Sequence, residues 1–189
     1  GKNSLAKLND ELSHYGETVM LMYGRNAIKS NGLYDEVIAI LRHAGKNIVE
    51  LSGVMPNPTY KKMMEGVQLV REHNVSLILA VGGGSVIDCA KGISISAYCE
   101  DEDPFQKYWV EYQDVTNKIV PVASILTMVG TGSEMNGGSV ITHEETKYKI
   151  GRAFPANVFP KFSILNPEYT FSVSQYQMVS GVFDTMSHL

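Results

Sequence analysis

The chain has 189 residues, which is enough for one domain with a sizeable hydrophobic core. Its formal net charge is −4 and its Lys and Arg residues do not cluster, so we expect neither nucleic acid nor a membrane surface as a partner. The longest apolar runs have strand length, no secretory leader is recognised, and Cys89 and Cys99 are the two cysteines, which together indicate a cytoplasmic protein with reduced thiols.

The first fifty residues predict two helices that alternate with two strands. The helices are expected within residues 1–16 and at about 33–43, and the strands at 18–23 and 47–52. Leu5, Leu8 and Leu12 mark the inner face of the first helix, which is otherwise polar.

The turns after these two strands carry candidate ligand-binding residues. The first turn contains Gly24, Arg25 and Asn26. Where dinucleotide-binding folds place an acidic residue for the adenosine ribose, this turn offers the planar guanidinium of Arg25, which suits a phosphate. A solvated surface position explains Arg25 equally well. In the second turn Asn57 stands between two prolines, where it either lines a ligand cleft or caps the helix predicted at 59–73.

The most informative stretch is the turn between the third predicted strand, residues 76–81, and a helix that starts near Ser85. This turn consists of Gly82, Gly83 and Gly84. A helix N-terminus attracts anions through its unpaired N–H groups and its dipole, and a backbone without Cβ lets a phosphate come close. The alternative is a capping box formed by Ser85 and Asp88, in which the glycines only turn the chain. Three successive glycines favour the phosphate interpretation.

Small hydroxyl side chains follow the next strand, which is predicted at 119–126. They include Thr127, Thr131 and Ser133, in a loop that also contains glycines. Such side chains can donate hydrogen bonds to phosphate or ribose without crowding them. We therefore predict that this loop joins the glycine turn in binding the same ligand.

For the remaining segments before the last helix, the residue pattern predicts secondary structure but no binding or catalytic role. Residues 99–117 form a polar connection in which Phe105 and Trp109, four residues apart, are interpreted as a packing pair. A β-hairpin is predicted at 139–142 and 147–151, and a last short strand at 162–165.

The alternation of strands and helices predicts an α/β fold. We expect a Rossmann-like, mostly parallel sheet with flanking helices, right-handed crossovers and a separate β-hairpin. In such folds ligands bind at the carboxyl ends of the strands, where the turns described above lie.

The last predicted helix contains a candidate metal site. It begins near Ser174, which has the spacing of a capping box with Gln177. Asp184 and His188 are four residues apart, so they share one helix face with about 6 Å between their Cβ atoms. Such a pair can ligate one divalent cation, or form only a solvated ion pair. The apolar stripe of the helix comprises Met178, Val179, Val182, Phe183 and Met186.

Four segments together resemble the iron-containing alcohol dehydrogenases, and most of all the NADPH-dependent butanol dehydrogenase branch. They are Gly-Gly-Gly-Ser-x-x-Asp-x-x-Lys at residues 82–91, Asn57-Pro58, the loop at 127–134, and Asp184-x-x-x-His188. The resemblance covers essentially the whole chain. It implies hydride transfer between NAD(P)H and a small aldehyde or primary alcohol, with NADP(H) preferred to NAD(H). Residues 24–27 depart from this branch, which commonly has Gly-Gly-Gly-Ser there.

The resemblance also assigns roles to single residues. Asn57 would line the cofactor cleft, Lys149 would contact the ribose on the nicotinamide side, and Tyr169 would lie nearby. Asp184 and His188 would supply two of four metal ligands, the others being two histidines farther on. Iron is the metal that the family implies, and zinc suits nitrogen and oxygen ligands equally well.

By the same resemblance the chain divides into two parts. Residues 1–173 would form the dinucleotide-binding domain, and residues 174–189 the first helix of a helical metal-binding domain that is otherwise absent. We expect the chain alone to be inactive and the full-length protein to be a homodimer. Two alternatives stay open: a zinc enzyme of the glycerol dehydrogenase type with the same fold, and a non-catalytic nucleotide-binding module. No general base is identified.

Overall fold

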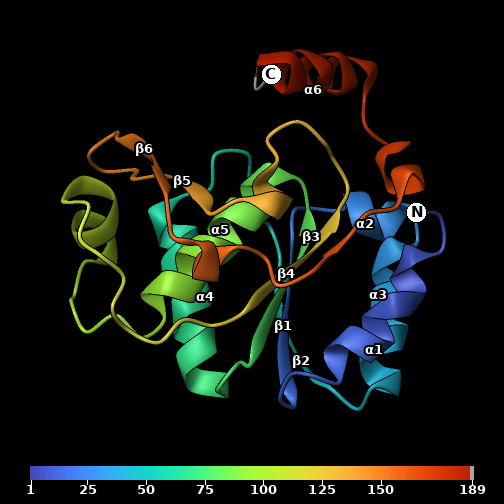
Figure 1. Cartoon of the computed structure of the whole chain (residues 1–189), viewed down its shortest axis with the longest axis horizontal. Coiled ribbons are helices and arrows are strands. Elements are labelled where there is room, and N and C mark those ends of the chain that lie inside the picture. The colour runs from blue at the N-terminus through green and yellow to red at the C-terminus, as the bar shows by residue number, and fades with distance from the viewer. Residues whose placement is uncertain (188–189) are drawn as a thin grey trace.

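A computed structural model, which describes residues 1–187, shows a five-stranded parallel sheet with helices on both faces (Figure 1). The strand order is β2-β1-β3-β4-β7, and each neighbouring pair is parallel. The strands are β1 (Thr18–Tyr23), β2 (Asn47–Leu51), β3 (Leu77–Gly82), β4 (Val122–Leu126) and β7 (Ser163–Ile164). This architecture confirms the predicted α/β fold with a mostly parallel sheet.

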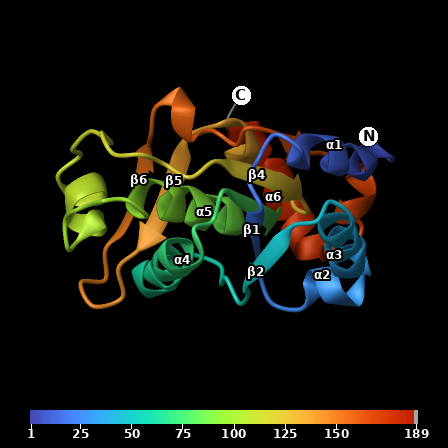
Figure 2. The ribbon, with the colours of Figure 1, turned by 90° about the horizontal axis from the view of Figure 1, so that it is seen from below.

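The two faces of the sheet are covered by different helices (Figure 2). One face carries η1 (Ser4–Lys7), α1 (Leu8–Leu12), α2 (Ala27–Ser30) and α3 (Leu33–His43), and the other carries α4 (Tyr60–His73) and α5 (Gly84–Ser96). In β3, Leu77, Leu79 and Val81 pack with the first group, whereas Ile78 and Ala80 pack with the second. A strand buried on both faces is apolar at successive positions, which explains the continuous apolar run in the sequence. Within residues 1–187, no helix is both long and apolar enough to cross a membrane.

The start of α4 corrects one prediction about Asn57. The residue that caps this helix is Thr59, whose side-chain oxygen accepts a hydrogen bond of 3.2 Å from the Lys62 N–H. Asn57 lies two residues earlier, is exposed, and has a left-handed backbone with φ of 57°. The capping interpretation of Asn57 is therefore wrong, and its role at a cleft stays a prediction.

The chain between β3 and β7 contains a hairpin and three short helices. These elements are η2 (Gln106–Val110), which is a π-helix, η3 (Ser133–Met135), β5 (Gly138–Thr142), β6 (Lys149–Ala153) and η4 (Ala156–Val158). The antiparallel pairing of β5 and β6 confirms the predicted hairpin, with its second strand shifted by two residues. Phe105 and Trp109 stack with ring centroids 5.9 Å apart, which confirms the predicted packing pair.

Gly137, at the start of the hairpin, has no room for a side chain. A Cβ atom there would lie 2.3 Å from the Phe154 carbonyl oxygen, and this backbone atom cannot rotate away. We expect Gly137→Ala to lower the free energy of unfolding by about 1–3 kcal/mol, as overpacking does. Urea unfolding would measure this loss. Gly24→Ala is the control because its Cβ would meet Val54 at 3.5 Å, an ordinary contact, so an equal loss in both variants would contradict the steric explanation.

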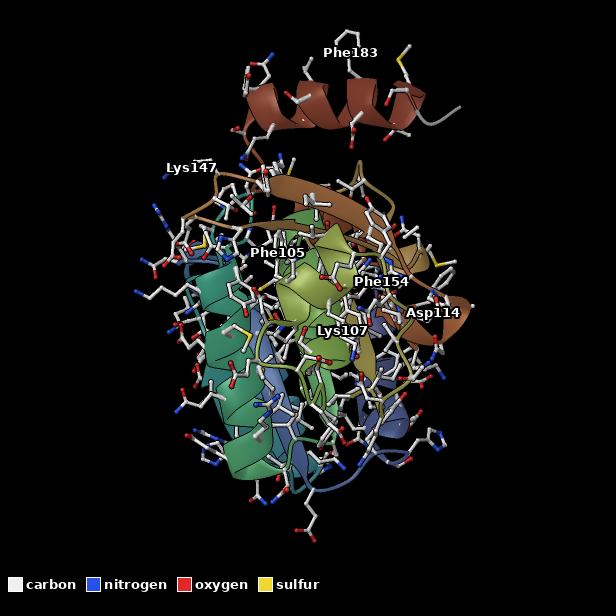
Figure 3. The ribbon with its side chains drawn as sticks, turned by 90° about the vertical axis from the view of Figure 1, so that its left-hand side faces the viewer. Phe105, Lys107, Asp114, Lys147, Phe154 and Phe183 are labelled. Atoms are coloured by element: carbon white, nitrogen blue, oxygen red, sulfur yellow. The ribbon has the colours of Figure 1, made fainter. Side chains whose placement is uncertain are left out.

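The last two helices are η5 (Pro167–Thr170) and α6 (Gln175–Ser187), and α6 stands beyond the carboxyl ends of the strands (Figure 1). The predicted cap is present in part, since Ser174 Oγ accepts a hydrogen bond of 3.3 Å from the Gln177 N–H. The residues of the predicted apolar stripe are 44–66% exposed. Phe183 is 66% exposed and points away from the sheet (Figure 3), and Gly181 is the one buried residue among positions 175–187.

Candidate functional site

The turns at the carboxyl ends of the central strands lie side by side. Tyr23 of β1 pairs with Val81 of β3, so the turn that begins with Gly24 neighbours the glycine turn. The N–H of Thr127, the residue after β4, donates to the Gly82 carbonyl at 3.0 Å. The predicted ligand-binding turns therefore share one edge of the sheet, as the parallel order requires.

The glycine turn places the N-terminus of α5 at this edge. Gly83 is the N-cap residue, and no side chain caps the helix. The first helical hydrogen bonds run from Val86 and Ile87 to the Gly83 carbonyl, at 3.0 and 3.2 Å, so the N–H groups of Gly84 and Ser85 have no intrahelical partner. The alternative interpretation of Ser85 and Asp88 as a capping box is therefore wrong. The geometry retains what an anion site needs, namely free N–H donors at the positive end of the helix dipole.

The loop at residues 127–136, which we call the wall loop, packs directly on the glycine turn. A Cβ atom at position 84 would lie 2.5 Å from Thr131 Oγ1, and one at position 83 would lie 3.1 Å from the Met128 Cβ. A Cβ atom at position 82 would lie 2.5 Å from the Val86 side chain. The three glycines are thus required by close packing on two sides of the turn.

The wall loop also contacts α6. A Cβ atom at Gly181 would lie 2.7 Å from the Val129 carbonyl oxygen, so α6 approaches the loop where it lacks a side chain. The Asp184 carboxylate lies on the same side, since a Cβ atom at Gly130 would be 3.0 Å from its Oδ2. One loop therefore contacts both the glycine turn and the carboxylate that was predicted to ligate a metal.

These elements enclose a pocket of about 360 Å³. Its lining residues are Gly84, Ser85, Met128, Val129, Gly130, Thr131, Ser180, Gly181 and Asp184. The pocket brings together Gly84, Ser85, Thr131 and Asp184, four predicted site residues that are as much as 100 positions apart. Its volume is in the lower part of the range for small-molecule sites.

The part of the chain that the structure describes supplies one of the two predicted metal ligands. Asp184 faces the pocket and is partly exposed. His188 lies outside the described residues. Among residues 1–187, no three His, Cys, Asp or Glu side chains are grouped closely enough to hold a metal ion. A metal at Asp184 would therefore need ligands beyond those that the structure describes.

Asp88 and Ser133 do not line this pocket. Both are turned inward: Ser133 is 2% exposed and donates its hydroxyl hydrogen to the Asp88 carboxylate. The other Asp88 oxygen accepts a hydrogen bond of 3.0 Å from the Val140 N–H. Burial raises the pKa of Asp88 above its ordinary value, while the Ser133 hydroxyl and nearby Lys91 act in the opposite direction.

Lys91 is a buried charge that the sequence interpretation did not assign. Its side chain is fully buried on α5, and its Nζ lies 3.7 Å from Asp88 Oδ1. Burial lowers the pKa of Lys91 to about 8. The sequence feature that could have predicted this burial is the spacing of Lys91 from Ile87 and Ser94, which places all three residues on one helix face; Ile87 and Ser94 are also buried.

The other predicted cofactor contacts do not line this pocket. Arg25 and Asn26 are exposed after β1, and Lys149 is exposed at the start of β6. Tyr169 is placed elsewhere: it lines a different pocket of about 570 Å³ together with Glu36 of α3. The structure does not bring Tyr169 to the pocket that contains Gly84, because η5 follows β7 on the α3 side of the sheet.

Comparison with known proteins shows the relatives of this chain. The family described as "Iron-containing alcohol dehydrogenase" matches residues 1–167. The chain is 45% identical over 195 residues to the probable NADH-dependent butanol dehydrogenase 1 of Bacillus subtilis, and 38% identical over 190 residues to an NADPH-dependent aldehyde reductase of Escherichia coli. All of the chain is covered in both cases, together with 48% of each relative, so the chain spans about half the length of the curated relatives it matches.

The crystal structure of an NADH-dependent butanol dehydrogenase A from Thermotoga maritima superposes with a TM-score of 0.92 and 38% identity. It matches all of this chain over 46% of its own length. An Escherichia coli structure of unknown function gives a TM-score of 0.91 at 36% identity. These structures confirm the predicted Rossmann-like fold.

Proposed function

The chain belongs to the iron-containing alcohol dehydrogenase family, and we propose on this basis that it is the dinucleotide-binding part of an enzyme that interconverts small aldehydes and primary alcohols. The observation that carries the proposal is the pocket in which the uncapped N-terminus of α5 faces Thr131 and Asp184. In this proposal residues 1–173 bind the nucleotide. Residues 174–189 begin a helical domain without which the chain is inactive, and the full-length enzyme is a homodimer.

The diphosphate of the nucleotide would lie on the N-terminus of α5. The N–H groups of Gly84 and Ser85 would donate to its oxygens, and the helix dipole would stabilise its charge. Thr131 is exposed opposite Gly84 and offers a hydroxyl donor at the same place. The Thr131 side chain can lie this close to the N-terminus of α5 only because residue 84 has no Cβ atom.

The reactive end of the nucleotide would point toward Asp184. In the loaded enzyme the nicotinamide would supply or accept the hydride, and a divalent metal, iron by family membership, would serve as the Lewis acid for the substrate oxygen. Asp184 would help to hold that metal, and His188 would be a second ligand. The wall loop fixes Asp184 at one side of the pocket through its contact with Gly130. A carboxylate that lines this pocket suits a metal-dependent enzyme better than a purely nucleotide-binding module.

Nucleotide binding can be tested by thermal unfolding with NADPH and NADH. At a concentration of 100 times Kd, either cofactor should stabilise the protein by about 2.7 kcal/mol. For a domain of this size that corresponds to a rise in Tm of roughly 5–10 °C. If neither cofactor shifts Tm at saturating concentration, the proposed function is wrong.

We also propose that NADP(H) is preferred to NAD(H). The relatives named above include an NADH-dependent and an NADPH-dependent enzyme, so similarity alone does not choose between them. The support comes from Arg25, which is exposed at the end of β1 beside the glycine turn. Its guanidinium can bind a 2′-phosphate with two parallel hydrogen bonds.

Replacing Arg25 with alanine tests this preference. A charge-assisted hydrogen bond contributes about 1.5–3 kcal/mol, and an exposed site favours the lower end, so NADPH should bind about tenfold more weakly. NADH binding should change by less than about twofold, since NADH lacks the 2′-phosphate. Calorimetric titration gives both affinities. The control is Arg42→Ala, because Arg42 is also exposed but lies in the last turn of α3. Equal losses for NADPH and NADH in the Arg25 variant would contradict the proposal.

A further inference from the structure

Lys91 connects α5 to the wall loop through a dense set of hydrogen bonds. Its Nζ donates to the Ser133 carbonyl at 3.0 Å and to Ser133 Oγ at 2.7 Å. It also contacts Asn136 O at 3.1 Å and Asn136 Oδ1 at 3.3 Å. An ammonium has three donors, so these four acceptors and the Asp88 carboxylate use its full capacity. Complete burial of a lysine ammonium costs folding free energy unless the ammonium is paired in this way. We therefore expect the buried Lys91 to have a functional role.

The same network holds the hairpin against α5. Asp88 accepts from the Val140 N–H of β5, and the Ser139 hydroxyl donates to the Asp88 carbonyl at 2.8 Å. Lys91 and Asp88 therefore hold two separate segments, the wall loop and β5, onto the helix whose N-terminus forms the glycine turn.

The position of Thr131 depends on this network. Thr131 Oγ1 accepts a hydrogen bond of 3.3 Å from the Ser133 N–H, and the Thr131 carbonyl accepts one of 3.4 Å from the Asn136 side chain. The residues that Lys91 binds are thus the residues that hold Thr131. Thr131 in turn packs against Gly84, so small movements of the wall loop would change the width of the pocket at the expected diphosphate position.

We propose, on the premise that this pocket binds a dinucleotide, that Lys91 is a positioning residue that holds the wall loop, and with it Thr131, at the distance from Gly84 that the diphosphate requires. Asp88 and Ser133 act through the same network. Binding is then strong because the wall loop is already ordered before the nucleotide arrives, and less conformational entropy is lost.

The charge of Lys91 gives this role a distinctive dependence on pH. The charged groups that act on its ammonium are Asp88 of α5 and Glu134 of η3. An anionic diphosphate would favour the protonated lysine, so by linkage nucleotide affinity should fall as pH rises above about 8, by at most about tenfold per pH unit. Folding stability should change with pH in the opposite direction. The pKa of the unfolded lysine is near 10.5, so the unfolded chain binds more protons than the folded chain between pH 8 and 10.5. Stability therefore rises with pH in this range.

The test is the affinity for NADPH and NADH between pH 7 and 9.5, measured by calorimetry on the wild type and on Lys91→Met. We expect the variant to bind both cofactors at least about tenfold more weakly at pH 7 and to lose the decline above pH 8. Lys62→Met is the matched control, since Lys62 pairs with Glu65 at the same i,i+3 spacing as Lys91 with Asp88 but lies on α4. It should keep the affinity within about twofold.

Ser133→Ala is a second variant that tests the same network if Lys91→Met does not fold. It removes the hydroxyl that joins Lys91 to Asp88 and changes little volume, and it should weaken both cofactors about three- to tenfold. The inference is overturned if either folded variant binds with the affinity and the pH profile of the wild type. If the wild type itself binds neither cofactor, the proposed function fails first, so the two failures are distinguishable.

Discussion

Replacing Gly84 with valine is expected to abolish nucleotide binding. The new side chain would start 2.5 Å from Thr131 Oγ1, in the pocket at the N-terminus of α5 that is proposed to hold the diphosphate. Each lost hydrogen bond to a charged phosphate contributes about 1.5–3 kcal/mol, so losing two of them should weaken NADPH and NADH binding by at least about 100-fold. Calorimetry, or the absence of the Tm shift described above, would measure the loss.

A double variant separates the two consequences of the new side chain. Thr131→Gly removes the Oγ1, Cγ2 and Cβ atoms that the valine would meet, so Gly84→Val with Thr131→Gly should fold without the clash. It should still not bind the nucleotide, because the valine itself blocks the helix N-terminus. Thr131→Gly alone should bind with only a moderate loss. Recovery of full affinity in the double variant would show that position 84 contacts the wall loop and not a phosphate.

The fold was predictable because its strongest patterns are local. β1 and α3 have the predicted bounds, since their apolar positions follow the period of a buried strand and of a one-sided helix. The glycine turn was predictable for the same reason: a strand, three glycines and a helix are consecutive in the sequence. The meeting of this turn with the loop after β4 followed from the parallel order alone.

The interior of the site was not predictable in the same way. The spacing of Ser85 and Asp88 fits a capping box, but Asp88 instead binds Ser133 and Val140, which are 45 and 52 residues away. Lysine is usually a surface residue, and Lys91 is buried because the wall loop folds over it. Such partners are set by tertiary packing, and a helical pattern contains no information about them.

The apolar stripe of α6 shows what a helical pattern alone does not predict. Its period correctly predicts a helix, yet Met178, Val182 and Phe183 are 56%, 54% and 66% exposed. Periodicity identifies which face of a helix is apolar but not what covers it. Gly181 and Asp184, on the opposite face, are the residues that approach the wall loop at Val129 and Gly130.

Replacing Asp184 with asparagine is expected to remove the metal and the activity of the full-length enzyme. Asparagine keeps the shape of the side chain but not its charge, and a neutral amide is a much weaker ligand for a divalent cation than a carboxylate. The loss of one direct ligand should exceed the 10–100-fold effects known for residues that only orient ligands, so aldehyde reduction should fall by about 100-fold or more. Metal content, measured by mass spectrometry on the purified protein, should fall with it, and the wild-type value would distinguish iron from zinc.

Nucleotide binding provides the internal control for this variant, because Asp184 contacts the wall loop at Gly130 and is proposed to hold the metal, not the diphosphate. The affinity for NADPH should therefore change much less than the activity. Ser180→Ala is the matched control: Ser180 lines the same pocket, but its hydroxyl is used within α6, where it donates to the Tyr176 carbonyl at 2.9 Å. If Asp184→Asn kept both its metal content and its rate of aldehyde reduction, the helix would not have the proposed metal-binding role. The Asp184 carboxylate would then have to be explained by the packing of α6 on the wall loop.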